Sequence, residues 1–169
     1  GLYNYSNATS FIKTMLADRQ SEISSPASRA LARMGDREVI EHLYSVLGDS
    51  NAERADAAVW GLIALGGDDI IQQMEMRAAT AEGNESFRIA KVLYALKKEE
   101  GKRLLREVYT EYPTLKQEVA YILAQDKDYD TENYLRSRLS ERMNETESTM
   151  VMRAKIAGSL IASGDPQAK

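Results

Sequence analysis

Apolar residues recur along this chain at the three- and four-residue spacings that place side chains on one face of an α-helix. The clearest stretch runs from Arg37 to Asp68 and holds two such patterns back to back, each followed by glycine and aspartate. The first pattern predicts a helix over about 38–47, and the second predicts a helix over about 52–65. Asp49 or Ser50 is expected to cap the second helix, because short polar side chains satisfy the free N–H groups there.

The second of these patterns recurs at a fixed distance along the chain. Residues 62–66 (LIALG) correspond to residues 31–35 (LARMG) on one side and to residues 93–97 (LYALK) on the other. Both steps are 31 residues, and a fixed period of this size indicates helical repeats that stack into a solenoid. The sequence therefore predicts an all-α fold, a right-handed α-α superhelix of about nine to ten helices in four to five pairs.

Leucines at equivalent places in these repeats are the predicted core. Leu62, Leu65, Leu93 and Leu96 fall on the apolar stripes and are expected to be almost fully buried between helices. The same helices are rich in alanine, whose small side chain allows paired helices to approach closely. The core is therefore expected to lie along the contacts between successive repeats.

The flanking segments are less regular. Residues 1–9 lack a helical period and are predicted to form a lead-in arm, and Ser10 is expected to cap the helix that follows. Residues 21–26 (SEISSP) are predicted to form a turn, with Pro26 in the first turn of the next helix. Residues 10–169 are predicted to form a single solenoid domain. Further helices are expected over about 26–34, 132–143 and 150–162.

The end of the chain resembles the opening of another repeat. Residues 164–168 (GDPQA) follow the pattern of residues 35–39 (GDREV), which begin a helix. A terminal repeat usually carries a polar capping helix, because each repeat buries its neighbour's apolar face. Ile156, Leu160 and Ile161 are followed by too few residues to cover them. We therefore expect the chain to be part of a longer protein, or this helix to be covered by a partner or by another copy.

The repeats resemble HEAT repeats of the HEAT-like, bilin-lyase-type subclass. In that subclass the second helix is rich in alanine and ends in a Leu-Gly-Asp type of turn, as in residues 29–36 (RALARMGD), 57–66 (AAVWGLIALG) and 153–165 (RAKIAGSLIASGD). The resemblance is close over 26–68 and 150–166 and looser over 98–145. It implies a HEAT/armadillo-like scaffold with a binding surface. A few members of the family are enzymes, so the shared fold does not by itself decide the function.

Catalytic and metal-binding chemistry has few candidates in this sequence. Metal-dependent hydroxylases of this family need several His-Glu pairs, and the one histidine, His42, is expected to be structural or on the surface. Residues 126–130 (DKDYD) space three carboxylates as in a calcium loop. Thr131 and Ser137 stand where such a loop needs Gly and Glu, so a solvated turn that caps the next helix is expected instead. Cysteine is absent, which excludes disulfides and cysteine nucleophiles. No catalytic residue, cofactor or metal site is predicted.

Charge leaves one local candidate for nucleic-acid binding. The net charge of −4 gives no whole-molecule attraction to nucleic acid, and no apolar run is long enough to cross a membrane. Seven cationic residues nevertheless fall within 19 residues and could contact phosphate. The alternative is a solvated helix face whose charges pair along the helix. The seven are Arg88, Lys91, Lys97, Lys98, Lys102, Arg103 and Arg106.

Trp60 is the most informative candidate for a binding residue. It is the one tryptophan of the chain and lies away from the apolar stripe, on the side of Asp56. Arg29 stands one period earlier and Lys91 one period later. A tryptophan flanked by cations suits peptide recognition, although Trp60 could instead pack into the next repeat. We therefore predict a protein-binding site on the concave face of the solenoid, formed by Arg29, Asp56, Trp60, Arg88 and Lys91.

These observations favour a non-enzymatic adaptor that binds a protein or peptide. Two alternatives stay open. The family resemblance implies one, an accessory factor that handles a bilin chromophore as bilin lyases do. The other is a nucleic-acid-binding protein that uses the cationic residues from Arg88 to Arg106. The identity of the partner, the oligomeric state and the compartment are left open, with a cytoplasmic location slightly favoured.

Overall fold

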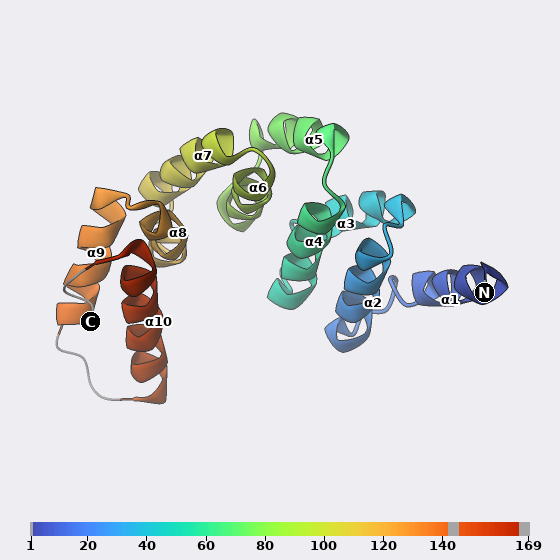
Figure 1. The fold of residues 1–169 in the computed structure, drawn as a ribbon, viewed down its shortest axis with the longest axis horizontal. Helices are drawn as coiled ribbons and strands as arrows, with labels where there is room; N and C mark the ends of the chain where they lie inside the picture. Colours follow the sequence, from blue (N-terminus) through green and yellow to red (C-terminus); the bar gives the residue numbers. More distant parts are fainter. Residues whose placement is uncertain (1, 142–145, 166–169) are drawn as a thin grey trace. The chain divides into compact units, whose positions relative to one another are not determined.

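The structure is a computed structural model that describes residues 2–141 and 146–165, with side chains from residue 8 onward except at position 98. Its described residues form ten α-helices and two short 3-10 helices, with no β-strand among them (Figure 1). The all-α prediction is therefore confirmed. The α-helices are α1 (Leu2–Thr14), α2 (Ser21–Arg33), α3 (Ile40–Val46), α4 (Ala52–Leu65), α5 (Asp68–Ala78), α6 (Gly83–Leu96), α7 (Lys98–Glu111), α8 (Lys116–Leu123), α9 (Tyr129–Ser140) and α10 (Glu147–Ser163), and the 3-10 helices are η1 (Arg37–Val39) and η2 (Ala124–Asp126).

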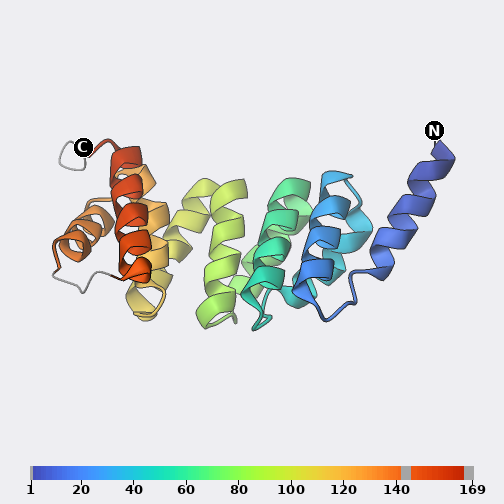
Figure 2. The same ribbon diagram turned by 90° about the horizontal axis from the view of Figure 1, so that it is seen from below.

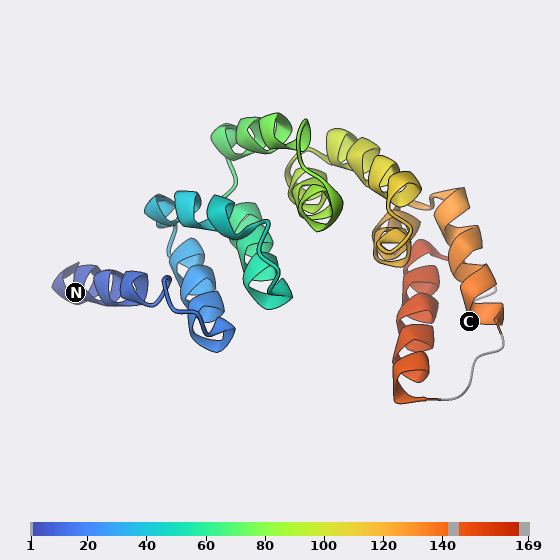
Figure 3. The same cartoon turned by 180° about the vertical axis from the view of Figure 1, so that it is seen from behind.

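Residue contacts divide the chain into two compact units, Gly1–Leu104 and Leu105–Lys169, with the boundary inside α7. In the first unit, α2, α4 and α6 lie side by side in one layer, and α3 and α5 form a second layer against them (Figures 2 and 3). Leu31, Leu62 and Leu93 are 31 residues apart, one on each helix of the first layer, and all three are 0% exposed. The repeat read from the sequence is thus the repeat of the packed core.

Helix α4 has the predicted bounds, but its cap differs from the prediction. The side chain of Asn51, rather than Asp49 or Ser50, accepts a hydrogen bond from the backbone N–H of Arg54. The helix ends at Gly66, whose φ of 55° lies in the left-handed region that glycine adopts without steric cost. Glycine therefore ends this helix as the sequence indicates, while the cap lies one or two positions later than expected.

Two segments near the N-terminus are helical where an arm and a turn were predicted. Residues 2–14 form α1, and α2 begins at Ser21, so residues 21–26 belong to that helix. The buried positions of α2 recur at helical spacing, but several are serines instead of large apolar residues. These serines are small enough to lie inside the contact with α4, and a search for apolar residues overlooks them. They are Ser21, Ser24, Ser25 and Ser28.

The core prediction is correct for two of its four leucines. Leu62 and Leu93 are fully buried, whereas Leu65 and Leu96 are only partly buried. Leu65 and Leu96 are the last residues of α4 and α6, so their side chains lie at the end of the helix layer and not between its helices. The 31-residue period correctly relates Leu62 to Leu93 and Leu65 to Leu96, because the members of each pair have the same burial. It does not show where the helix layer ends.

The second unit packs α8, α9 and α10 around a small core. The buried side chains of this core are Ala120, Ala124, Leu135, Ile156 and Leu160. On α10, Ile161 is 52% exposed although Ile156 and Leu160 are buried. The expected opening of a further repeat over residues 164–168 lies mostly outside the described residues, so it stays a prediction.

Asp128 caps α9, as the turn over residues 126–130 predicts. Its side chain accepts hydrogen bonds from the backbone N–H of Thr131 and from the Arg106 guanidinium. These contacts lower the pKa of the Asp128 carboxyl, because they outweigh the effect of burial, which alone raises it. The carboxylate therefore stabilises the start of α9.

Candidate protein-binding surface

The predicted site residues lie on three neighbouring helices of the first unit. Asp56 and Trp60 are one helical turn apart on α4, so they lie on the same face of that helix. Trp60 is partly exposed, and the guanidinium carbon of Arg33, on α2, lies 5.1 Å from the centroid of its ring. At this distance a guanidinium and an aromatic ring attract each other. Trp60 is therefore fixed on its α2 side by a cation that the sequence analysis did not include.

On the α6 side of α4, Asp56 connects the two helices through an ion pair with Lys91. The Nζ atom of Lys91 lies 3.4 Å from Oδ1 of Asp56 and 5.3 Å from the ring centroid of Phe87. The side chains of Lys91 and Asp56 remain 29% and 56% exposed, so the ion pair is open to solvent and contributes little to stability by itself. Cations and aromatic rings thus alternate across three helices. We call these residues, together with Arg29, the α2–α4–α6 surface: Arg29, Arg33, Asp56, Trp60, Phe87 and Lys91.

The arrangement follows from the tilt of helical side chains toward the helix N-terminus. A long side chain covers the turn that precedes its own Cα. Arg29 is the equivalent of Trp60 by the 31-residue period, and Arg33 is one turn later, so Arg33 reaches back to the level of Trp60. Lys91 reaches back one turn in the same way, to the level of Asp56. The 31-residue period therefore relates Arg29, Trp60 and Lys91 as equivalent positions on α2, α4 and α6. One helical turn added to the position equivalent to Trp60 on α2 would have identified Arg33.

Arg29 lies on the same helix as Arg33 and is partly exposed. It makes no ion pair, hydrogen bond or ring contact with any other described residue. Its guanidinium is therefore available for a partner.

Arg88 has a different role from the one predicted. It is only 7% exposed, and its Nη1 atom donates hydrogen bonds to the backbone carbonyl oxygens of Leu47 (2.7 Å) and Asp49 (2.9 Å). These carbonyls follow the last turn of α3, where helix carbonyls lack partners within the helix. Arg88 thus secures the end of α3 to α6, and it does not belong to the binding surface.

The cationic cluster from Arg88 to Arg106 is largely neutralised. Five of its seven members have a carboxylate or carbonyl partner within their own unit. Arg88 contacts carbonyls, and the pairs with carboxylates are Lys91–Asp56, Lys97–Glu75, Arg103–Glu100 and Arg106–Asp128. The cluster therefore has the paired character of a solvated helix face, and it gives no support to phosphate binding.

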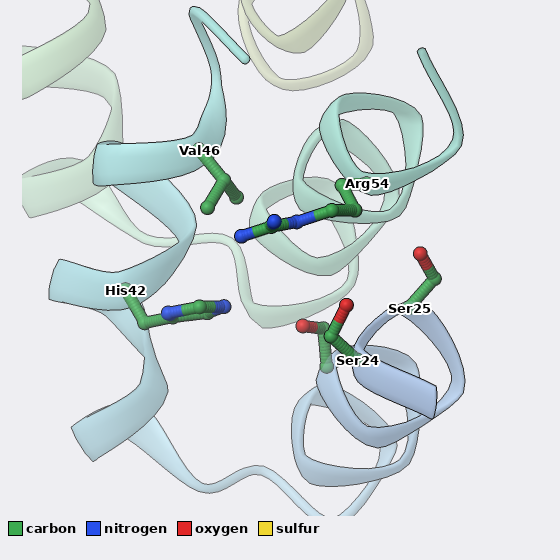
Figure 4. A pocket seen from close by; sticks show the side chains of 6 residues that line it. Ser24, Ser25, His42, Val46 and Arg54 are labelled. Atoms are coloured by element: carbon green, nitrogen blue, oxygen red, sulfur yellow. The ribbon is translucent and has the colours of Figure 1, made fainter. Parts of the chain in front are cut away.

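A small polar hollow lies between α2, α3 and α4, and it is partly open to solvent. Figure 4 shows His42 and Arg54 projecting toward each other across it, with Ser24 and Ser25 on the α2 side. Burial and the charge of Arg54 lower the pKa of His42 below its usual value. Arg54 is paired with Asp49 at 3.3 Å. His42 is thus kept neutral within the helix packing, which agrees with the structural role predicted for it.

Comparison with known families gives one match. Residues 27–49, which run from the middle of α2 through η1 and α3, match the family model of the PBS lyase HEAT-like repeat. This segment of the chain is therefore similar to a HEAT-like repeat. Comparison with curated proteins and with solved structures gives no match.

The matched HEAT-like repeat contains the Gly-Asp turn on which the resemblance was based. Gly35 has a φ of 73°, and the Asp36 side chain accepts a hydrogen bond from the backbone N–H of Glu38 at the start of η1. Glycine is therefore favoured at position 35 because its φ is positive, and aspartate is favoured at position 36 because its carboxylate caps the start of η1.

No helix in the described part of the chain is long and apolar enough to cross a membrane. Nor do the His, Asp and Glu side chains described there gather in a group of three or more that could hold a metal ion.

Proposed function

We propose that this protein is a non-enzymatic interaction scaffold that binds a protein or peptide on the α2–α4–α6 surface. The observation that carries the proposal is the position of Trp60, which is partly exposed beside Arg33 of α2 and one turn from Asp56, the partner of Lys91 on α6. Tryptophan and arginine supply much of the binding energy at protein interfaces, because they offer large contact areas and directed hydrogen bonds. HEAT-like repeats commonly mediate protein interactions, which agrees with this role.

The surface is also ordered before a partner arrives. Its side chains stand on helices that are held together by the buried residues Leu31, Leu62 and Leu93. Arg33 and Lys91 further restrict the neighbouring rings through their cation–ring contacts. A partner therefore orders few additional side chains on binding, which lowers the entropic cost of association.

The proposal is tested by affinity capture from the native source with the wild-type protein, followed by measurement on the purified partner. Trp60→Ala should weaken binding about 30-fold, which corresponds to the loss of roughly 2 kcal/mol expected at an interface hot spot. Tyr129→Ala is the matched control, because Tyr129 is 72% exposed on α9 in the second unit. It should leave the affinity unchanged.

Folding of the variants is checked by circular dichroism, since Trp60 is partly buried. Trp60→Phe keeps an aromatic ring and should retain most of the binding if Trp60→Ala lowers stability. A partner that binds wild type and Trp60→Ala equally well would refute this surface as the binding site. A chromophore-handling role would instead give a bilin absorbance after mixing with bilin, which the scaffold should not show.

A further inference from the structure

We infer that the partner of the α2–α4–α6 surface presents an acidic segment, whose carboxylates contact Arg29 and Arg33 while an apolar side chain packs beside Trp60. This inference rests on the proposed function and adds the chemical class of the partner. It depends on three features of the surface. Two guanidiniums have no ion pair, the charges of Lys91 and Asp56 cancel each other, and apolar side chains lie near Trp60.

Arg29 and Arg33 are one helical turn apart on α2, so they project from the same face. Neither makes an ion pair or a hydrogen bond with another described residue. Eight other arginines in the described part of the chain have a carboxylate or carbonyl partner, whereas Arg19 and Arg153 also lack one; Arg29 and Arg33 differ from these two in standing one turn apart on the same helix. The eight are Arg37, Arg54, Arg77, Arg88, Arg103, Arg106, Arg136 and Arg138.

The ring contact of Arg33 leaves its hydrogen-bonding capacity in place. A guanidinium that lies over an aromatic face attracts the ring through its own face, while its N–H groups point outward in the plane. That edge can donate two parallel hydrogen bonds to a carboxylate, and such charge-assisted bonds are among the stronger ones. Arg33 makes no hydrogen bond to a described residue, so its N–H groups are available to a carboxylate while its guanidinium carbon lies 5.1 Å from the Trp60 ring centroid.

The other charges of the surface define where the acidic segment lies. Lys91 is paired with Asp56, so this pair adds little net charge. Glu22 and Glu53 are exposed near the N-terminal ends of α2 and α4. Glu22 is seven residues from Arg29, which is about 10 Å along a helix. Carboxylates of a partner are therefore attracted to the C-terminal half of α2 and repelled from the N-terminal ends.

Apolar side chains lie about one helical turn beyond Trp60 on α4. Ile63 is partly exposed and Ala64 is exposed, and both follow Trp60 on α4. An apolar side chain of the partner can pack there and exclude water from the neighbouring carboxylate–guanidinium contacts. Exclusion of water strengthens such contacts, because the local dielectric constant falls.

The inference is tested by selecting a phage-displayed random peptide library on the purified full chain. The peptides selected on wild type should be enriched in Asp and Glu next to apolar residues. A synthetic copy of a selected peptide should bind less tightly as NaCl is raised, because salt screens exposed charges. It should bind the double variant Arg29→Glu, Arg33→Glu at least about 100-fold less tightly, or tenfold for each contact, when measured by fluorescence anisotropy.

Arg153→Glu is the matched control, because Arg153 is exposed on α10 and likewise makes no ion pair with a described residue. It should leave the peptide affinity unchanged. If the double reversal lowers the melting temperature, the milder variant Arg29→Gln, Arg33→Gln replaces it and should bind at least about tenfold less tightly.

The outcomes separate this inference from the proposed function. Peptides that require Trp60 but lack acidic residues, or that still bind the charge-reversed protein, would overturn the acidic partner and leave the binding surface standing. Peptides whose affinity is unchanged by both Trp60→Ala and the charge reversal would overturn both. Failure to select any peptide that requires Arg29 and Arg33 also overturns the acidic partner.

Discussion

Gly101 lies where α7 approaches the backbone of α6 so closely that no side chain fits. A Cβ atom at this position would lie 1.9 Å from the backbone nitrogen and 2.2 Å from the Cα atom of Tyr94. Both are backbone atoms, so rotation of a side chain cannot remove the overlap. Gly101→Ala must therefore move one helix relative to the other, and we predict that it destabilises the first unit strongly.

The expected magnitude is the balance of two effects. Alanine gains about 0.5–1 kcal/mol over glycine in a helix, because it restricts the unfolded chain. Overpacking of a well-packed contact usually costs about 1–3 kcal/mol, and more where the backbone must shift. We expect a net loss of about 3 kcal/mol or more for Gly101→Ala, which is a large part of the roughly 5–15 kcal/mol that stabilises a typical domain.

Two other helical glycines serve as controls. A Cβ at Gly61 would lie 2.9 Å from Cδ1 and 3.2 Å from Cδ2 of the buried Leu43, which are side-chain and not backbone atoms, so Gly61→Ala should cost only about 1 kcal/mol after the helix preference of alanine is included. A Cβ at Gly158, within α10, would meet nothing within 4 Å. Gly158→Ala should therefore stabilise its unit by about 0.5–1 kcal/mol.

The measurement is urea unfolding followed by far-ultraviolet circular dichroism. With a denaturant dependence of about 1–3 kcal/mol per molar urea, Gly101→Ala should lower the unfolding midpoint by about 1 M or more. Gly158→Ala should raise the midpoint slightly, and Gly61→Ala should change it little. If Gly101→Ala unfolds at the same urea concentration as wild type, the close approach of α6 and α7 is absent and the reasoning is wrong.

Three further predictions follow from buried and paired residues. Leu62→Ala should lower the free energy of unfolding by roughly 2–5 kcal/mol in the same urea assay, and a loss below about 1 kcal/mol would contradict its place in the core. Arg88→Ala should cost about 2–4 kcal/mol, because it leaves buried carbonyls after α3 without a donor, and amide exchange at the end of α3 should accelerate. Asp128→Asn should lower stability at neutral pH. The lowered pKa of Asp128 means that its carboxylate stabilises the fold above the unfolded-state pKa of about 3.9 and loses this effect as pH falls through the folded-state value. Unfolding curves of Asp128→Asn and wild type should therefore converge in strong acid, and a constant difference would show that Asp128 acts through packing alone.

The sequence by itself determined the helical class and the register of the repeats. Apolar residues at helical spacing and glycines at helix ends act within a few residues, so they can be read without knowing the fold. The bounds of α4 and the burial of Leu31, Leu62 and Leu93 at 31-residue steps follow from such local signals. The rows that hold Arg29, Trp60 and Lys91 follow from the same period.

Only the tertiary structure decided which polar residues are buried and what each cation contacts. The serines of α2 are buried by the helices packed around them, which their polarity does not indicate. Arg88 contacts the backbone carbonyl of Leu47, 41 residues away, and Arg33 contacts the ring of Trp60 on the neighbouring helix α4. Long side chains reach a full turn along a neighbouring helix, so their partners depend on how the helices are placed. For that reason the sequence-based prediction included Arg88 and omitted Arg33, whereas in the packed helices Arg88 is buried and Arg33 lies beside Trp60.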